Sequence, residues 1–371
     1  MRVCVDIQAA VAQGAGVGRY TRGLVQHLGP QRGDDELRLF CFDFKRNGVS
    51  FSAPGATLRA NRWLPGRIVQ RAWRTLGAPP YNWFAGSADL YHFTNFIRAP
   101  LTRGRSVATI YDVSFLRHAE AAEPGNLRYL RRHMRKTARD ADAIQTISEF
   151  SANEIHELLD VPRDRIHVAY PGLDHHAEPI APEQADALRR KMGVDRPYLL
   201  FVGTLEPRKN LPFLFKVFDA LESFDGLLLL AGMRGWKVEP ILDAMQGARR
   251  AASIRHLDYV SDADLQALYA GATLFVYPSL YEGFGIPPME AMLADTPVVS
   301  SGGGSLPEVL GDAAEIIPDF DVDAWRDRIA TLLRDTARRS ALVEKGRQRT
   351  ALYTWPEAAR RTWTLYRSLA S

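Results

Sequence analysis

Residues 280–290 read Leu280-Tyr281-Glu282-Gly283-Phe284-Gly285-Ile286-Pro287-Pro288-Met289-Glu290. They follow residues 273–278, a short apolar run that is typical of a buried strand. They lead into residues 289–293, an apolar segment without helix breakers. Glycines let the backbone approach a ligand, and prolines are tolerated in the first helical turn. This order of strand, glycine loop and helix N-terminus predicts an anion-binding site at the carboxyl edge of a parallel sheet.

Two carboxylates bracket this loop, Glu282 before the glycines and Glu290 in the predicted first helical turn. A carboxylate can accept hydrogen bonds from two neighbouring hydroxyl groups at once. Sugars and riboses carry such hydroxyl pairs, so one glutamate can hold a sugar and the other a ribose, with a diphosphate between them. The alternative interpretation is that Glu290 only complements the helix dipole.

A second pair of charged residues follows another predicted strand. Residues 198–202 are continuously apolar, as expected of a strand that helices cover on both faces, and Gly203 ends the run. Arg208 and Lys209 lie shortly beyond it. Arginine offers a planar fork of donors and lysine a compact charge, so the pair can bind a diphosphate. The alternative is a solvated loop.

Taken together, these motifs resemble those of the retaining GT-B glycosyltransferases of group 1 (family 4). Glu282 and Glu290 match the E-x7-E signature of that family, and Arg208 and Lys209 match its basic pair. The resemblance covers essentially the whole chain. It implies an α/β fold with two Rossmann-like, doubly wound domains that face each other across a cleft, and the alternation of predicted strands and helices along the chain agrees with it.

The expected domain boundary falls at an interdomain connection of the family's P-G-x-D type, which Pro171 and Gly172 begin. We expect an N-terminal, acceptor-side domain over residues 1–172 that is completed by a C-terminal helix over residues 355–371. The nucleotide-sugar-binding domain is expected over residues 173–354.

The resemblance also implies roles for the matching residues. Glu282 orients the transferred sugar, Arg208 and Lys209 neutralise the donor diphosphate, and the departing phosphate accepts the proton of the acceptor in a front-face attack. No metal ion and no cofactor is expected. The remaining donor-binding candidates are Gly16, Gly18, Gly203, Tyr259, Val260, Gly283, Phe284, Gly285 and Glu290.

The first half of the chain begins with a predicted strand over residues 2–7, followed by a glycine-rich loop that contains Gly16 and Gly18. In the resembled family such a loop approaches the donor diphosphate, whereas a flexible surface loop is the alternative. Further strands of this half are predicted over residues 37–42, 88–93, 106–111, 143–147 and 166–169.

The strand predicted over residues 106–111 ends in Tyr111, and Asp112 follows it. Here the sequence departs from the family pattern. Family members usually carry His immediately before this Asp, near the transferred sugar. Asp112 is therefore a catalytic candidate, but Tyr111 can only donate a hydrogen bond and cannot change its charge near neutral pH as imidazole does. His118 is a partial substitute or, more simply, a surface residue.

Two segments of the first half predict charged helical faces. Leu64, Ile68, Ala72 and Leu76 share one face of a helix that also carries Trp73 and three arginines. Such a helix either lies in a membrane interface or packs on its own sheet. A second helix lines one face with basic residues, which either meet an anion or are simply solvated: Arg128, Arg131, Arg132, Arg135, Lys136 and Arg139.

Composition restricts the remaining choices. With 371 residues and a formal net charge of +4, the chain suits two domains and anionic small partners, but it has too little positive charge to imply nucleic acid. Cys4 and Cys41 are predicted to be buried, without a disulfide framework. The absence of a signal peptide and of an apolar run of spanning length predicts a cytoplasmic protein, with an anionic membrane surface as a further partner.

Within the family, the chain looks most like the bacterial mannosyltransferases of surface polysaccharide synthesis, on the basis of residues 16–20, 111–115 and 281–290. GDP-mannose is therefore the favoured donor, with other GDP-, UDP- or dTDP-sugars as alternatives, and the acceptor is a saccharide or a lipid-linked saccharide. Two other functions stay open: a sugar-nucleotide epimerase or phosphorylase on the same fold, and a protein that binds a nucleotide sugar without transfer.

Overall fold

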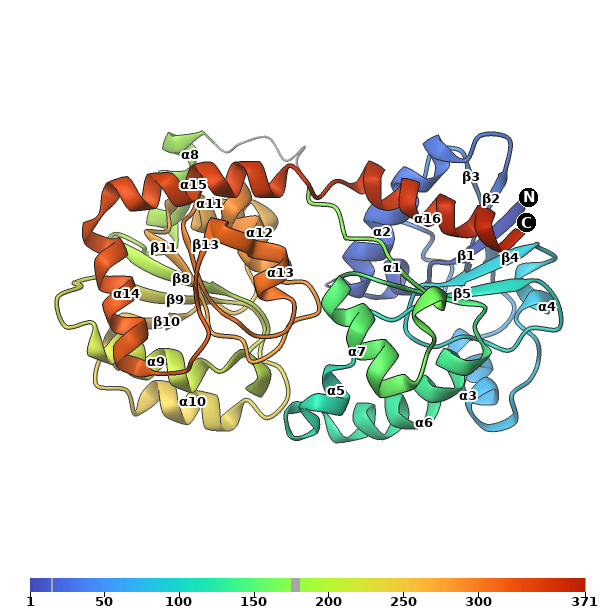
Figure 1. Ribbon diagram of the computed structural model, residues 1–371, viewed down its shortest axis with the longest axis horizontal. Coiled ribbons are helices and arrows are strands. Elements are labelled where there is room, and N and C mark those ends of the chain that lie inside the picture. The colour runs from blue at the N-terminus through green and yellow to red at the C-terminus, as the bar shows by residue number, and fades with distance from the viewer. Residues whose placement is uncertain (15, 175–180, 371) are drawn as a thin grey trace. The chain divides into compact units, whose positions relative to one another are not determined.

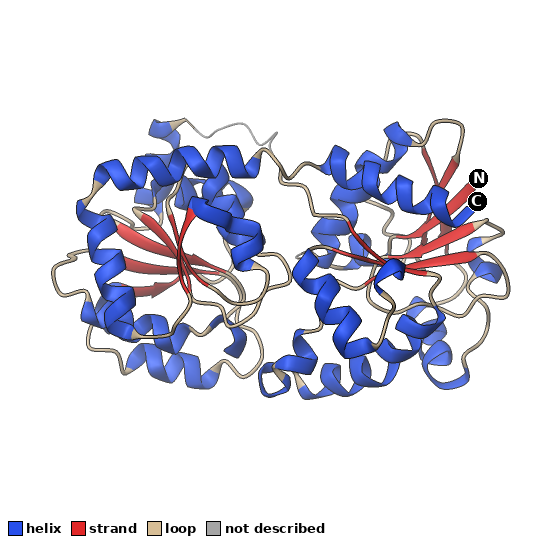
Figure 2. Cartoon of the chain, in the orientation of Figure 1, coloured by secondary structure: helices blue, strands red, loops and turns tan. Residues whose placement is uncertain are grey.

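The computed structural model describes residues 1–14, 16–174 and 181–370, and the chain divides into two compact units (Figure 1). Unit 1 comprises Met1–Leu116, Pro124–Gly172 and Tyr353–Ser371, and unit 2 comprises Arg117–Glu123 and Leu173–Leu352. Each unit is a Rossmann-like layer structure in which helices cover both faces of a parallel sheet (Figure 2).

Unit 1 is built on a seven-stranded parallel sheet in the order β3-β2-β1-β4-β5-β6-β7. The chain leaves β1 for β2 on one side and later returns to β4 on the other side, so the topological switch point lies between β1 and β4. Its strands are β1 (Arg2–Asp6), β2 (Glu36–Phe42), β3 (Ala56–Asn61), β4 (Leu90–Phe93), β5 (Arg105–Thr109), β6 (Ala143–Thr146) and β7 (Ile166–Val168).

The C-terminal helix α16 packs on α2 of this unit. The indole Nε1 of Trp363 donates a hydrogen bond to the backbone oxygen of Leu28 over 2.8 Å. A Cβ on Gly23 would lie 2.3 Å from the ring of Trp355, so only glycine allows this approach. The helices are α1 (Gln8–Ala12), α2 (Val17–Leu28), α3 (Gly66–Leu76), α4 (Asn82–Ala85), α5 (Ser114–Arg117), α6 (Pro124–Asp140), α7 (Glu149–Leu159) and α16 (Trp355–Ala370).

Unit 2 is built on a six-stranded parallel sheet in the order β10-β9-β8-β11-β12-β13. Its central strands are apolar and buried because helices cover both faces of the sheet. The strands are β8 (Tyr198–Val202), β9 (Leu227–Ala231), β10 (Ile254–His256), β11 (Leu274–Tyr277), β12 (Val298–Ser301) and β13 (Ala314–Ile317). The helices are α8 (Pro182–Lys191), α9 (Leu211–Ala220), α10 (Glu239–Gln246), α11 (Asp262–Gly271), α12 (Ile286–Leu293), α13 (Leu306–Leu310), α14 (Val322–Arg334) and α15 (Thr336–Thr350).

The switch point of unit 2 lies between β8 and β11. The chain runs from β8 to β9 and β10 on one side and then returns to β11 on the other side of β8. In open sheets of this kind, ligands bind at the carboxyl edge beside such a switch point.

Three features differ from the sequence predictions. The edge strand β3 was not predicted. Helix α12 begins at Ile286, just before the two prolines that were expected in its first turn, so Glu290 lies beyond that turn and not in it. The segment Arg117–Glu123 belongs to unit 2, where Trp236 donates a hydrogen bond to the backbone oxygen of Ala121 over 2.6 Å.

Among the described residues, no helix combines the length and the apolar character that crossing a bilayer requires.

Candidate functional site

The predicted basic pair and the first glutamate come together at the switch point of unit 2. Arg208 and Lys209 lie in a short 3-10 turn, Pro207–Lys209, shortly after β8, and Glu282 lies in the loop that follows β11. Because β8 and β11 are neighbours and both strands end at the same edge, residues 73 positions apart in the sequence become direct contacts.

One oxygen of Glu282 is the centre of this cluster. Its Oε1 accepts hydrogen bonds from Lys209 Nζ at 2.6 Å, Ser279 Oγ at 2.5 Å and Tyr277 OH at 3.1 Å, and Arg208 Nη1 lies 2.9 Å away. Lys209 Nζ also donates to Tyr277 OH over 2.7 Å. Among the described residues, none donates a hydrogen bond to the second carboxylate oxygen, Oε2.

A second carboxylate, Glu206, completes the cluster and was not singled out from the sequence. It is 2% exposed, and its Oε1 accepts a hydrogen bond from Arg208 Nη2 over 2.5 Å. The cluster therefore contains two cations and two carboxylates, which matters because an unpaired charge is very costly to bury. Glu206 lies two residues before Arg208, which was the sequence feature that could have pointed to it, but sequence spacing does not show which way a loop side chain points.

Burial and charge set the protonation of the cluster. Burial alone raises the pKa of the Glu282 carboxyl, but the charges of Arg208 and Lys209 outweigh burial and hold that pKa at about 2. Burial, followed by the charge of Arg208, lowers the pKa of the Lys209 ammonium group. Burial and the neighbouring Glu282 raise the pKa of the Tyr277 phenol well above its ordinary value, so this phenol stays a donor. The Glu282 carboxylate is thus ionised throughout the neutral pH range.

The loop that carries Glu282 is supported from two sides. On one side, Arg208 Nη1 donates to the backbone oxygen of Tyr281 over 2.5 Å. On the other side, the backbone N–H of Ser305 donates to the backbone oxygen of Glu282 over 2.9 Å. Gly304 has a φ of +68°, and a Cβ on it would lie 2.3 Å from the same oxygen. The glycine-rich loop after β12 therefore holds the position of Glu282.

The glycine loop after Glu282 leads into α12 as predicted, but the second glutamate is placed differently. Gly283 and Phe284 are buried, and Gly285 has a φ of +96° and caps α12. Glu290 is the fifth residue of that helix and accepts a hydrogen bond from Tyr269 OH at Oε2 over 3.1 Å. The interpretation that Glu290 sits in the first turn and complements the helix dipole is therefore wrong.

Other predicted donor-binding residues of unit 2 lie at the same sheet edge. A Cβ on Gly232 would lie 2.1 Å from the backbone oxygen of Gly203, so the chain segments that leave β8 and β9 meet backbone to backbone. Tyr259 and Val260 follow β10, which is the edge strand and is separated from β8 by β9. The side chain of Tyr259 is 75% exposed.

The candidates of unit 1 lie at the carboxyl ends of β1 and β5. Gly16, with a φ of +42°, caps α2, and a Cβ on Gly18 would lie 2.0 Å from the backbone oxygen of Gln13. Asp112 accepts a hydrogen bond from the backbone N–H of Ser114 over 2.9 Å, at the start of α5.

Tyr111 does not stand in for a histidine. It is buried, and its OH donates to the backbone oxygen of Thr94 over 2.7 Å, so the phenolic proton is already in use. His118 belongs to unit 2, where its ring packs edge-on against Tyr281 with a centroid distance of 5.7 Å, and its Nδ1 lies 3.4 Å from Glu120 Oε1. His118 is thus a neighbour of the Glu282 loop rather than a lone surface residue.

Within the described residues, no three His, Cys, Asp or Glu side chains lie close enough together to hold a metal ion.

Two Rossmann-like, parallel-sheet units in one chain are the architecture of the GT-B glycosyltransferases. The family models agree: Glycosyl transferases group 1 matches residues 184–349, and Glycosyltransferase Family 4 matches residues 14–177. The chain is 32% identical to the O-antigen chain mannosyltransferase B of Escherichia coli over 375 residues, which cover 95% of this chain and 96% of that protein. The chain therefore belongs to the group 1, family 4 glycosyltransferases.

Solved structures show the same fold at lower identity. A sucrose-phosphate synthase from Thermosynechococcus elongatus aligns with a TM-score of 0.77 and 19% identity, over 100% of this chain and 99% of that chain. The Anabaena protein HepE, in complex with UDP and glucose, aligns with a TM-score of 0.73 and 18% identity, over 100% and 99% of the two chains.

Proposed function

We propose that this glycosyltransferase moves mannose from GDP-mannose, with retention of the anomeric configuration, to a saccharide or lipid-linked saccharide acceptor in surface polysaccharide synthesis. The observation that carries the proposal is the buried cluster of Arg208, Lys209 and Glu282 at the switch point of unit 2. The choice of mannose and of polysaccharide synthesis follows the relative from Escherichia coli.

Arg208 and Lys209 are proposed to hold the donor diphosphate. An ammonium group has three N–H donors, and Lys209 spends one on Tyr277 and one on Glu282. The third has no partner among the described residues, so it is available to a phosphate oxygen. Gly285 and the N-terminus of α12, at the same sheet edge, add the partial positive charge of a helix start.

The two glutamates are proposed to hold hydroxyl groups. Lys209, Tyr277 and Ser279 all donate to Oε1 of Glu282, which leaves Oε2 for a hydroxyl of the transferred sugar. Glu290 is proposed to bind the ribose, and its contact with Tyr269 sets the orientation of the carboxylate. In this scheme the departing phosphate accepts the acceptor proton, and the cluster stabilises the charge that develops on the leaving diphosphate.

The remaining candidates keep the roles that the family resemblance suggests. Gly203, Gly283, Phe284, Tyr259 and Val260 are proposed to border the donor in unit 2. From unit 1, Gly16 and Gly18 would approach the diphosphate, and Asp112 would contact the reacting groups. We further propose that the protein works in the cytoplasm at the inner face of the cytoplasmic membrane, where a lipid-linked acceptor would be presented.

Substitution of the basic pair tests the proposal. Arg208→Ala and Lys209→Ala should each lower the transfer rate at least tenfold, or about 1.4 kcal/mol of transition-state stabilisation. Arg196→Ala, which removes an exposed arginine paired with Asp225 at 3.3 Å, is the control and should leave the rate unchanged. Near wild-type rates in both site variants would refute the role of the pair.

The donor and the stereochemistry need separate measurements. A ligand that binds only the folded state raises the melting temperature, so a panel of nucleotide sugars should show the largest rise with GDP-mannose. The anomeric configuration of the product, read by NMR, should equal that of the donor. Binding without transfer across an acceptor panel would instead favour a nucleotide-sugar-binding protein.

A further inference from the structure

Unit 1 exposes an unusual combination of side chains on α3 and α6, which we call the α3–α6 surface. The two helices lie side by side: the guanidinium of Arg74 on α3 stacks 4.3 Å from the ring centroid of Tyr129 on α6. Figure 1 shows both helices on the same side of unit 1. The α3–α6 surface consists of the exposed side chains of α3, α6 and the two residues Trp63 and Leu64 that precede α3.

The apolar part of this surface is left outside the core. The sequence predicted one apolar face of α3 that contains Ile68 and Leu76, but the structure turns the neighbouring Val69 and Trp73 to the core instead. Val69 and Trp73 pack against the core of unit 1, whereas Ile68 is 62% exposed and Leu76 is 78% exposed. Trp63, just before the helix, is 85% exposed. Large apolar side chains exposed together on one helix indicate a surface that meets another phase or molecule.

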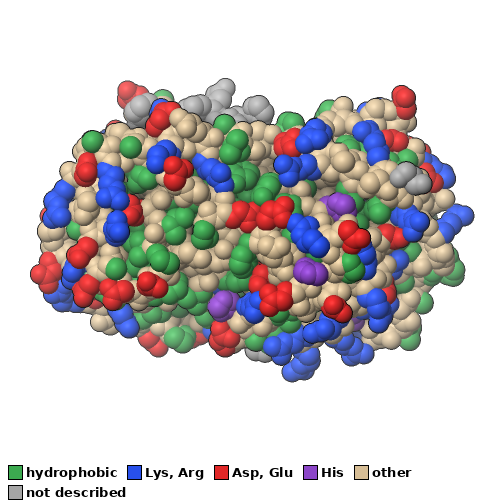
Figure 3. All heavy atoms as spheres, viewed as in Figure 1, with side chains coloured by type: hydrophobic (Ala, Val, Ile, Leu, Met, Phe, Trp, Pro, Cys, Tyr) green, Lys and Arg blue, Asp and Glu red, His purple; other side chains and the backbone are tan. Residues whose placement is uncertain are grey.

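The polar part of the surface is basic. The exposed positions of α6 are almost all arginine or lysine, α3 exposes Arg67, Arg71 and Arg74, and Asp140 is the only acidic residue in the two helices. Figure 3 shows blue side chains gathered where α6 lies. Among the described residues, four arginines of α6 have no carboxylate partner, and they are Arg128, Arg131, Arg132 and Arg135. Surface charge of one sign that the protein does not pair itself favours an anionic partner.

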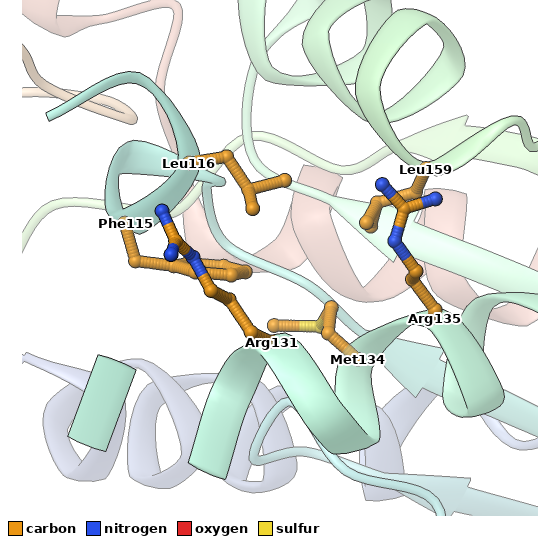
Figure 4. A pocket seen from close by; sticks show the side chains of 6 residues that line it. All are labelled: Phe115, Leu116, Arg131, Met134, Arg135 and Leu159. Carbon is orange, nitrogen blue, oxygen red and sulfur yellow. The ribbon is translucent and has the colours of Figure 1, made fainter. Parts of the chain in front are cut away.

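Two of these arginines also stand over an apolar hollow (Figure 4). Arg131 and Arg135 extend from α6 with their guanidinium groups directed toward Phe115 and Leu159, respectively. The hollow measures about 350 Å³, and Met134 contributes to its apolar lining. An anionic head group with a short apolar portion beneath it fits this combination of two cations over an apolar floor.

We propose that unit 1 docks on an anionic lipid bilayer through the α3–α6 surface. Trp63, Ile68 and Leu76 would enter the interface between head groups and acyl chains, and the arginines of both helices would bind lipid phosphates, as in other amphipathic helices that lie in membranes. A bilayer is favoured over an acidic protein because the exposed Ile68 and Leu76 lie among arginines along α3, which is the pattern of a helix that lies in a membrane interface. The biological reason for this docking rests on the proposed function, because a lipid-linked acceptor would be presented at the membrane. Vesicle binding itself can be measured without donor or acceptor.

Vesicle flotation of the full-length protein tests the docking. The wild-type protein should float with vesicles of phosphatidylcholine and phosphatidylglycerol, should remain unbound with phosphatidylcholine alone, and should lose binding as salt screens the charges. Each basic residue near an anionic surface contributes about a fivefold gain in affinity, so Arg128→Ala, Arg132→Ala and Arg135→Ala together should weaken binding about a hundredfold. Ile68→Ser should weaken it by about fivefold or more.

Matched variants on unit 2 separate the surface from general effects. The triple variant Arg249→Ala, Arg326→Ala and Arg347→Ala removes the same net charge, and these arginines are exposed and ion-paired. Leu352→Ser is the counterpart of Ile68→Ser, since both side chains are 62% exposed. Both controls should bind vesicles like the wild type, and melting curves should show that all four variants are folded.

Several results would overturn the proposal. If the wild type does not bind anionic vesicles, the docking proposal is refuted, and an acidic protein becomes the favoured partner of the α3–α6 surface. Equal losses in the α6 triple variant and in its unit 2 counterpart would show that only net charge matters. Transfer to a soluble acceptor is measured separately. A wild-type protein that binds vesicles but transfers no sugar would refute the proposed function and not the docking. A wild-type protein that transfers sugar but does not bind vesicles would refute the docking alone.

Discussion

A double-mutant cycle on Glu282 and Lys209 gives the sharpest test of the buried cluster. Lys209 Nζ and Glu282 Oε1 are 2.6 Å apart, and both residues are less than 9% exposed. Glu282→Gln leaves two cations facing one carboxylate, and Lys209→Met leaves one cation facing two. The double variant leaves Arg208 with Glu206 as a balanced pair, joined over 2.5 Å.

The expected magnitudes follow from this charge count. Two unit charges at 2.6 Å attract each other by about 6 kcal/mol at an effective dielectric constant of about 20, before the cost of removing them from water is subtracted. Breaking a buried pair by removing one partner costs about 3–5 kcal/mol, because the other charge stays buried and uncompensated. Each single variant should therefore lose about 3–5 kcal/mol of unfolding free energy. The double variant should lose no more than one single variant does, which gives a coupling energy of at least about 3 kcal/mol in magnitude.

Urea unfolding of the wild type, the two single variants and the double variant provides the four free energies. The exposed pair Arg196 and Asp225, 3.3 Å apart, supplies a control cycle whose coupling should stay below about 1 kcal/mol. Additive losses at Glu282 and Lys209, with a coupling below about 0.5 kcal/mol, would refute the reasoning. They would mean that the two side chains do not share one buried charge environment in solution.

Three further predictions concern other residues. Burial lowers the pKa of His92 from 6.5 to about 3, so protonation favours the unfolded chain. The unfolding free energy should therefore fall by about 3 kcal/mol from pH 7 to pH 4. The difference in melting temperature between the wild type and His92→Gln should shrink over the same range. Gly304→Ala should cost about 2 kcal/mol or more in unfolding free energy and slow transfer, because its φ is +68° and its Cβ would meet the backbone oxygen of Glu282. Glu206→Gln should lower kcat about tenfold, because it removes the charged partner that orients the guanidinium of Arg208. It should not raise the KM for donor, because the cluster becomes more positive. A rise in KM with unchanged kcat would contradict this.

Much of unit 2 could be predicted from the sequence because its central strands are buried on both faces. Continuous apolar runs predicted β8 and β11, and the motifs just beyond them predicted which residues meet at the sheet edge. The edge strand β3 (Ala56–Asn61) was not predicted although Ala56, Leu58 and Ala60 alternate with polar residues, because two of these three are only alanines and none of the six residues is buried. An edge strand takes its conformation from pairing with β2, which is a tertiary contact that local sequence does not encode.

The limits at the site have the same physical origin. Spacing placed Arg208, Lys209 and Glu282 correctly because parallel strands bring their carboxyl ends to one edge. The spacing did not reveal that the side chain of Glu206 turns inward, because its direction depends on how the buried charges of the cluster balance one another. Likewise, helical periodicity showed an apolar face on α3, but only the packing against β2 and its neighbours decided that Val69 is the residue that enters the core.

The balance of charge within the cluster has a consequence for how a donor would bind. Two cations compensated by two carboxylates exert little net attraction on a distant diphosphate, so the cluster is built for orientation more than for long-range steering. What it offers is a set of donors whose positions are fixed before the ligand arrives: Glu206 fixes the fork of Arg208, and Tyr277 fixes the ammonium group of Lys209. Fixed donors cost no reorganisation when negative charge develops on a leaving phosphate, and they stabilise that charge most strongly where water is excluded. The second carboxylate therefore has a catalytic rationale, because without it Arg208 would keep the contacts of Nη1 with Glu282 and Tyr281 but would lose the hydrogen bond of Nη2 that orients the fork.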